Sequence, residues 1–403
     1  LWPNGYRDRN TALVKQQIGH GNTNLFFADD KERGYIQDLN FKINGQSVFY
    51  SLYQKQADIA EIKLTEPLLP GDSLFIETPF RVKIPGDFSR MGHQDQAYQI
   101  TQWYPKPAVY DREGWHPFSY LDLGEFYSEF GSYDVFITLP ENYFVAATGV
   151  LVDNPSEEAR IAQRIRDTKS GRFLESNRIP SSSSRLKTLH FRQDSIHDFA
   201  WFADKRFLIA QKEVVLPESG RSVGAFAYFL PEHYGVWNKV PDYIERTLLF
   251  YSDKLGDYPY SRCTAVDGAL KAGGGMEYPM ITVVNYFNDF KLTERTVMHE
   301  VGHNWLYGIL AFNERKYPWL DEGLNSFYEN EYIEKYYPND LFLADYALPK
   351  FLSKNRFPDF YANDFAYLFT QSQHDYQPCG LPSEAFSSIN YGASVYFTPV
   401  MML

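Results

Sequence analysis

Two histidines four residues apart constrain this chain more than any other feature of its sequence. They flank a glutamate in the run His299-Glu300-Val301-Gly302-His303. On an α-helix, residues i and i+4 share one face, so both imidazoles can reach a single metal ion. The fold must therefore place a helix here and keep that face of the helix free for a ligand.

A third metal ligand is expected from a second helix. A catalytic zinc site uses three protein ligands and keeps a fourth position open for water. Glu322 follows His303 by 19 residues, and a helix fits residues 321–336, ending before Pro338. Two helices joined by a loop of this length can bring the carboxylate to the histidines. The sequence therefore predicts one Zn2+ ion held by His299, His303 and Glu322.

Two further carboxylates have predicted roles beside the metal. Glu300 points about 100° around the helix from His299, so it can face the metal-bound water without ligating the ion. We expect it to take the proton of that water. Glu329 lies two helical turns beyond Glu322 on the same face. It is predicted to hold the ring of His303 by a hydrogen bond.

The chain changes character near residue 205. Short β-rich runs separated by Gly, Pro and Asn occupy residues 1–205 and predict an N-terminal β-sandwich. Residues 206–403 carry helical patterns, such as the apolar positions from Val240 to Leu255. Within that part, Thr293 is predicted to cap the histidine-bearing helix, which should run to about Leu306. The predicted fold class is therefore multidomain α+β.

Composition and charge exclude other classes of protein. A formal net charge of −12 disfavours nucleic acid as a partner, because phosphate contact needs a basic face. No run approaches the roughly 18 apolar residues of a membrane-spanning helix. The two cysteines, Cys263 and Cys379, are too few for a disulfide scaffold and could either pair once or stay free.

These motifs resemble those of the gluzincin aminopeptidases, the family of aminopeptidase N and leukotriene hydrolase, and the general likeness is to bacterial members. The discriminating run is Gly273-Gly274-Gly275-Met276-Glu277, whose Glu277 lies 22 residues before His299. It resembles the family's Gly-x-Met-Glu-Asn motif, in which the strand edge pairs with the substrate backbone and the Glu binds the free α-amino group. The resemblance implies substrate-binding roles for Gly274, Gly275, Met276 and Glu277.

Two other segments match the family. The run Tyr391-Gly392-Ala393-Ser394-Val395-Tyr396 has the spacing of its tyrosine pair. The resemblance implies that Tyr396 is catalytic and donates to the oxyanion of the tetrahedral intermediate, with Tyr391 as the alternative. The run Thr101-Gln102-Trp103-Tyr104 resembles the segment by which the family's N-terminal sandwich reaches the active site. It implies substrate-binding roles for Gln102 and Tyr104.

The resemblance covers nearly the whole chain. It implies a thermolysin-like α/β zinc domain over residues 206–403, cut short at its C-terminus, without the family's C-terminal helical domain. The implied activity is zinc-dependent removal of N-terminal residues from peptides that have a free N-terminus. Two alternatives remain open: a thermolysin-like zinc endopeptidase, and a peptide-binding protein that has kept the fold without catalysis. The sequence does not assign a compartment, and export in a bacterium is suggested by the family likeness alone.

Overall fold

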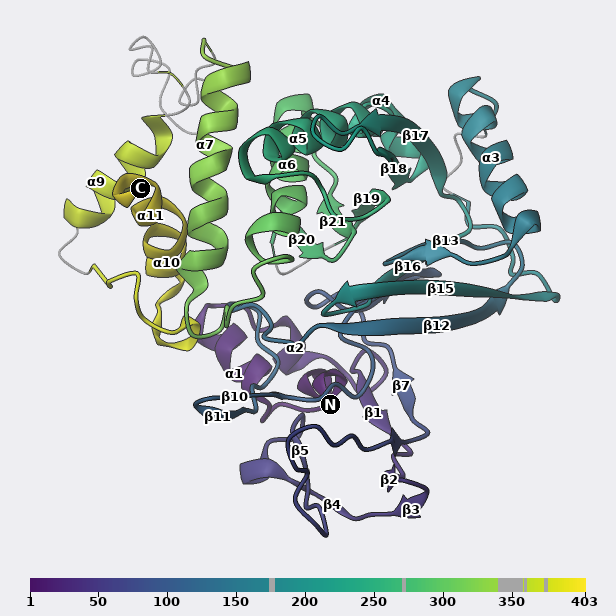
Figure 1. The fold of residues 1–403 in the computed structure, drawn as a ribbon, viewed down its shortest axis with the longest axis vertical. Coiled ribbons are helices and arrows are strands. Elements are labelled where there is room, and N and C mark those ends of the chain that lie inside the picture. The colour runs from purple at the N-terminus through teal and green to yellow at the C-terminus, as the bar shows by residue number, and fades with distance from the viewer. Residues whose placement is uncertain (174–177, 270–272, 340–357, 359–360, 373–375) are drawn as a thin grey trace. The chain divides into compact units, whose positions relative to one another are not determined.

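The structure is a computed structural model that describes residues 1–173, 178–269, 273–339, 358, 361–372 and 376–403 (Figure 1). The chain divides into two compact units. The first comprises Leu1–Asp122 and Ala200–Phe202, and the second comprises Leu123–Phe199, Ala203–Ala269 and the chain from Gly273 onward. The domain boundary predicted near residue 205 stays a prediction.

The first unit is a β-sheet region made of short strands. Antiparallel pairs join β1 to β7, β4 to β5, β8 to β9 and β10 to β11, and β2 lies between β3 and β6. The strands are β1 (Tyr35–Gln37), β2 (Lys42–Ile43), β3 (Gln46–Ser47), β4 (Tyr50–Leu52), β5 (Ala60–Ile62), β6 (Ile76–Glu77), β7 (Arg81–Lys83), β8 (Gly92–Gln94), β9 (Ala97–Ile100), β10 (Val109–Asp111) and β11 (Gly114–His116). The helical segments are η1 (Trp2–Tyr6), α1 (Ala12–Gly19), α2 (Asn24–Phe27) and η2 (Tyr53–Lys55).

The second unit begins with a long antiparallel ribbon. Strand β12 (Gly131–Pro140) pairs with β15 (Leu186–Ile196), which also pairs with β14 (Val150–Leu151). Helix α3 (Pro155–Lys169) begins after Asn154, because the Asn154 side chain accepts a hydrogen bond from the backbone N–H of Glu157. Strand β13 (Phe144–Ala147) lies between β12 and β14 in the chain. Strand β16 (Trp201–Asp204) follows β15, and its first two residues belong to the first unit.

A five-stranded mixed sheet forms the centre of the second unit. Its order is β17 (Leu208–Val215), β18 (Ser222–Phe229), β19 (Arg262–Gly268), β21 (Ile281–Asn285) and β20 (Gly275–Tyr278). The three middle strands run parallel and are largely buried on both faces, as expected for strands covered from both sides. Strand β20 runs antiparallel to β21 and forms one edge of the sheet.

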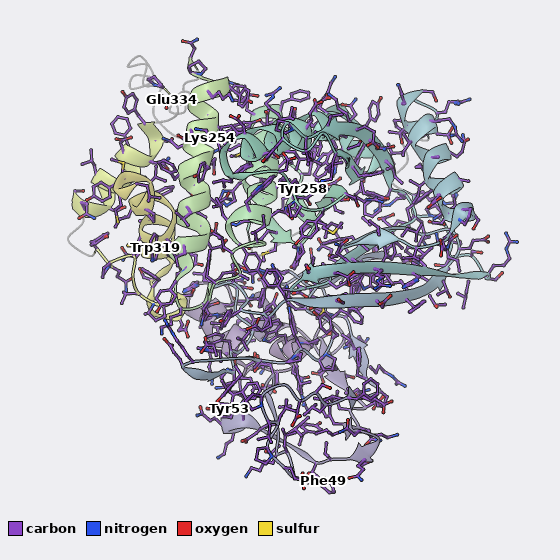
Figure 2. All side chains as sticks on the ribbon, viewed as in Figure 1. Phe49, Tyr53, Lys254, Tyr258, Trp319 and Glu334 are labelled. Carbon is purple, nitrogen blue, oxygen red and sulfur yellow. The ribbon has the colours of Figure 1, made fainter. Side chains whose placement is uncertain are left out.

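Two long helices pack on this sheet, and a third packs on one of them (Figure 1). Helix α5 (Val240–Leu255) contacts β17 and β18, and α6 (Phe290–Leu306) contacts β20, β21 and α5. Helix α7 (Leu324–Tyr336) packs against α6. Their shared core contains many aromatic side chains, such as Tyr258, which is labelled in Figure 2. These large rings contribute much of the buried apolar area of this unit. The predicted α+β fold class is therefore confirmed.

Short helical segments complete the second unit. Before and after α7 the chain forms two π-helical turns, η4 and η7, which lie next to each other. The short helical segments of this unit are η3 (Pro231–His233), α4 (Tyr234–Trp237), η4 (Trp319–Gly323), α9 (Ala362–Ser372), η6 (Ser383–Ala385), α10 (Ser388–Tyr391), η7 (Gly392–Phe397) and α11 (Thr398–Met402).

The predicted cap of the histidine-bearing helix was wrong by one turn. Helix α6 begins at Phe290, and the Asp289 carboxylate accepts a hydrogen bond of 2.8 Å from the backbone N–H of Leu292. Thr293 lies inside the first turn, where its hydroxyl donates to the carbonyl of Asp289 at 2.7 Å. Asp and Thr both suit the cap position, and the earlier residue occupies it.

The structure also bears on the cysteines and on membrane-spanning helices. Cys263 is buried, Cys379 is half-buried, and the two are not bonded to each other. In the described part of the chain, no helix combines the length and the apolar character needed to span a bilayer.

We expect Leu248→Ala to destabilise the protein far more than Leu249→Ala. These neighbours on α5 differ in burial, since Leu248 is 0% exposed in the core and Leu249 is 36% exposed. Removing a buried leucine side chain costs about 2–5 kcal/mol of unfolding free energy, and alanine itself favours helix. Urea denaturation followed by circular dichroism measures the difference. Equal losses in the two variants would contradict the burial of this helix face.

Candidate metal centre

Helix α6 carries three of the predicted site residues. Val297, Met298 and Val301 hold one face of the helix in the core of the second unit. His299 and His303 lie on another face, one turn apart, as their spacing predicts. Because the core side chains fix the rotation of the helix, they also fix the direction in which both imidazoles point.

Both imidazoles meet the carboxylate of Glu322. His299 Nε2 lies 3.0 Å from Glu322 Oε2, and His303 Nε2 lies 3.4 Å from the same oxygen. The two Nε2 atoms are 3.2 Å apart. Tetrahedral zinc with ligands at 2.0–2.1 Å separates its ligand atoms by about 3.3 Å. The three predicted ligands therefore come together at distances that fit one Zn2+ ion.

The turn that presents Glu322 is packed tightly against η7. Gly323 follows the ligand, and a Cβ added to it would lie 2.8 Å from the carbonyl oxygen of Val395. Glycine at this position allows η4 and η7 to approach each other. The approach brings Tyr396 of η7 to the site, where its hydroxyl donates to Glu322 Oε1 at 2.6 Å. An irregular π-helical turn at such a place is typical of functional sites.

Each imidazole is held from behind by a second carboxylate. His299 Nδ1 lies 2.9 Å from Glu329 Oε2, and Glu329 also accepts a hydrogen bond from Arg295. His303 Nδ1 lies 2.7 Å from Asp321 Oδ1. These contacts leave both Nε2 atoms directed toward Glu322, the arrangement that metal-binding histidines require.

The predicted partner of Glu329 is corrected by this geometry. Glu329 was expected to hold His303, but it contacts His299, and Asp321 takes the place beside His303. The reason is the direction of the helices, because contacts between α6 and α7 run antiparallel. Asn325 donates to the carbonyl of His299 at 2.7 Å, and Glu329 reaches back to Arg295. Later residues of α7 therefore face earlier residues of α6.

Hydrogen bonding rather than burial controls the charge of these groups. Burial alone would lower the pKa of His299, but hydrogen bonds to Glu322 and Glu329 outweigh it and raise that pKa to about 10. Burial alone would raise the pKa of Glu329, but the charge of Arg295 and the bond from His299 lower it to about 2. The pKa of Glu322 is likewise held below its ordinary value by both histidines, despite burial.

Glu300 lies between the metal centre and the edge strand β20. A Cβ added to Gly275 would lie 2.5 Å from the Glu300 Cδ atom, so only glycine leaves room for this carboxyl group. Burial raises the pKa of Glu300 to about 7, with partial opposition from His299 and His303. A carboxyl group of this pKa can both accept and return a proton near neutral pH.

Glu277 projects from β20 toward the same place. One of its carboxylate oxygens lies within 4.8 Å of a ligand atom of Glu300 and of His303. The side chain is buried, and burial raises its pKa well above the ordinary value, with further contributions from neighbouring carboxylates that include Asp321. The structure therefore brings Glu277 to the metal centre, as the glycine-rich motif implies.

The other predicted residues divide between the two units. Gly274 and Met276 lie at β20: the Gly274 carbonyl accepts from the backbone N–H of Asn285, and the Met276 carbonyl from the Thr282 hydroxyl. The alternative tyrosine, Tyr391, is buried with its ring centroid 6.2 Å from that of Tyr396.

Gln102 and Tyr104 belong to the first unit. Gln102 is buried and has a positive φ of 46°, and Tyr104 is half-buried. Their substrate-binding roles stay predictions.

Sequence reasoning missed several residues around the metal centre. Asp321 and Asn325 flank the predicted ligand on the same helical segment, and their polar character next to Glu322 was a usable signal. Arg295 precedes His299 by one turn, which was a second signal. Glu314 gave no such signal in the sequence, because it lies in an irregular turn between α6 and η4 with no periodic pattern around it.

Comparison with known proteins gives the fold a name. The structure is similar to that of an M1 zinc metallopeptidase from Deinococcus radiodurans, with a TM-score of 0.55, 18% sequence identity, and coverage of 91% of this chain and 70% of that chain. A mutant of that enzyme bound to a Tyr-Ser-Ala substrate matches with a TM-score of 0.53 and 14% identity, over 91% of this chain and 71% of the other.

A third similar structure is aminopeptidase A from Legionella pneumophila in complex with aspartic acid. It matches with a TM-score of 0.53 and 15% identity, over 86% of this chain and 41% of that chain. No family model matches the sequence, and a search of curated proteins found no match. The resemblance inferred from the motifs is thus confirmed at the level of the fold, which is that of bacterial M1 zinc metallopeptidases.

Replacing Glu329 by Gln should weaken zinc binding roughly 10- to 100-fold, because the amide no longer supports the ring of His299 with a full charge. Competition with a chromogenic chelator measures the affinity. Glu334→Gln is the matched control, since Glu334 is exposed on the same helix, α7 (Figure 2). Unchanged affinity in the Glu329 variant, or an equal loss in both variants, would refute this supporting role.

Proposed function

We propose that this protein is a zinc-dependent aminopeptidase that hydrolyses the N-terminal peptide bond of peptides with a free N-terminus. The observation that carries the proposal is the position of Glu277. Its carboxylate lies within 4.8 Å of Glu300 and His303, beside the three converging metal ligands. A buried carboxyl group so close to the reacting centre suits a substrate whose ammonium group is adjacent to the bond that is cut, because the ammonium stabilises the ionised carboxylate.

Zinc would supply the electrophilic part of the chemistry. Held by His299, His303 and Glu322, it would lower the pKa of a bound water and polarise the peptide carbonyl. The protein supplies the remaining groups. Glu329 and Asp321 keep the two imidazoles oriented through their Nδ1 atoms, so that both rings present Nε2.

Glu300 is the proposed proton carrier. In its ionised form it accepts a proton from the attacking water, and it then returns that proton to the nitrogen of the leaving amine. Its pKa of about 7, raised by burial, suits both halves of this exchange. The close packing of Gly275 against its carboxyl group restricts where the proton is taken and delivered.

Tyr396 is the proposed donor to the oxyanion. Burial and the nearby charge of Glu322 raise the pKa of its phenol well above the ordinary value, so the hydroxyl keeps its proton. The hydroxyl donates to Glu322 Oε1 at 2.6 Å. A small rotation toward the scissile carbonyl would let it donate to the negative oxygen that develops in the transition state.

Strand β20 and Glu277 are the proposed substrate cradle. Within the sheet as described, β20 pairs on one side only, so its outer edge can form backbone hydrogen bonds with an extended peptide. The glycines at Gly274 and Gly275 permit a close approach of that peptide. Glu277 then binds its α-ammonium group, which sets the number of residues removed at each turnover to one.

The first test replaces Glu300 by Gln. We expect kcat for an aminoacyl chromogenic substrate to fall roughly 10²- to 10⁴-fold, because the amide cannot move the proton. Zinc content should stay at one ion per chain, since Glu300 is not among the ligands. Elemental analysis and steady-state kinetics measure both, with Glu334→Gln as control and chelator-treated protein as the blank. Full activity in the Glu300 variant would disprove the mechanism.

The second test separates an aminopeptidase from an endopeptidase. A peptide with a free N-terminus should be cleaved, and its N-acetylated copy should not. Glu277→Gln should lower kcat/KM for the free peptide by roughly 10- to 100-fold, since a charge-assisted hydrogen bond is lost. Equal cleavage of both peptides would instead favour the endopeptidase, and binding without cleavage would favour a catalytically silent protein.

A further inference from the structure

A second group of carboxylates adjoins the metal centre. Glu277, Glu314 and Asp321 each place an oxygen within 4.8 Å of the others. All three are almost completely buried, and Glu314 is only 1% exposed. Glu277 belongs to this group and also to the group with Glu300 and His303, so the two sites are continuous.

Several carboxylate oxygens of this group lack a hydrogen-bond partner. In the part of the chain that the structure describes, neither oxygen of Glu314 has a hydrogen-bond partner. The same holds for Glu277 Oε1 and Asp321 Oδ2. Buried polar groups are ordinarily satisfied, and buried like charges repel, so a cation placed between these carboxyl groups would supply the missing partners and favour their ionised form.

The backbone holds Glu314 in this position. Asn313 closes the turn by accepting from the N–H groups of Lys316 and Tyr317, at 3.2 Å and 2.9 Å. On the other side, Ser383 donates its backbone N–H to the Arg315 carbonyl at 2.9 Å. The inward direction of the Glu314 side chain is therefore built into the fold.

We propose that Glu314 and Asp321 join Glu277 in a three-carboxylate pocket that selects a primary ammonium group at the N-terminus of the substrate. The inference rests on the proposed function and narrows its substrate class. A primary ammonium has three N–H donors, one for each carboxylate. An N-methylated residue or an N-terminal proline has two, so one buried carboxylate would stay unpaired.

The geometry of the group fits an ammonium ion. Three acceptors placed 2.8 Å from one tetrahedral nitrogen lie about 4.6 Å apart, and the three carboxylate oxygens lie within 4.8 Å of one another. A divalent cation is the other cation that carboxylates attract. Calcium requires six to eight oxygen ligands and magnesium an octahedral set. The pocket provides three carboxylates beside the proposed substrate site, which favours the ammonium group.

The test compares the binding of two probes by calorimetry. L-leucinamide and N-methyl-L-leucinamide are titrated into the zinc-loaded wild-type protein, into Glu314→Gln and into the control Glu334→Gln. We expect the wild type and the control to prefer L-leucinamide by about 10-fold or more. In the Glu314 variant, affinity for L-leucinamide should fall about 10-fold, and the preference should shrink to less than about 3-fold. Asp321→Asn, which keeps an oxygen for His303, should act in the same direction and serves if the first variant does not fold.

Two results would overturn the pocket. One is unchanged discrimination between the probes in both variants. The other is a second equivalent of divalent metal in the purified protein that disappears in Glu314→Gln, which would make the group a metal site. Hydrolysis of leucine p-nitroanilide is measured alongside. Discrimination without hydrolysis would reject the proposed aminopeptidase and keep the pocket, whereas hydrolysis without discrimination would reject the pocket alone.

Discussion

The meeting of one Glu322 oxygen with both imidazoles is the contact on which the rest of the site depends. It requires α6 and the segment from η4 to α7 to lie antiparallel with one particular register. That register places Glu329 behind His299 and Asp321 behind His303. The close packing of η4 on η7 then adds Tyr396. A shift of either helix by one residue would break all of these contacts together.

A high density of buried carboxylates gives the second unit its particular electrostatics. Those bound to histidine or arginine, Glu322 and Glu329, are held in the charged form. Those that face one another, Glu277 and Glu314, have a raised pKa because burial and like charges oppose ionisation. The site thus contains carboxylates that histidine or arginine already compensates, and carboxyl groups whose ionised form still needs a cation. The compensated carboxylates, Glu322 and Glu329, are suited to holding a metal ion and its histidines, and Glu277 and Glu314 are suited to binding a positively charged ligand.

The sequence allowed the metal ligands and the fold class to be predicted, and the reasons are local. Spacing along a helix fixes which side chains share a face, so His299 and His303 could be paired without knowing the fold. The helix cap and the contacts between elements were harder to predict. Two residues suit the N-cap of α6, and the partner of Glu329 depends on the relative direction of two helices. Glu314 was beyond reach, since its position comes from a turn closed by Asn313 and Ser383, and irregular backbone leaves no periodic signal.

Gly275 shows that a missing side chain can carry structural information. The volume that a methyl group would fill at this strand edge is occupied by the carboxyl group of Glu300, 25 positions later in the chain. The conformation of the proton-carrying residue is thus specified partly by an empty space on a different element. Positions 275 and 300 therefore form a steric pair, in which any enlargement of the first has to be answered by a displacement of the second.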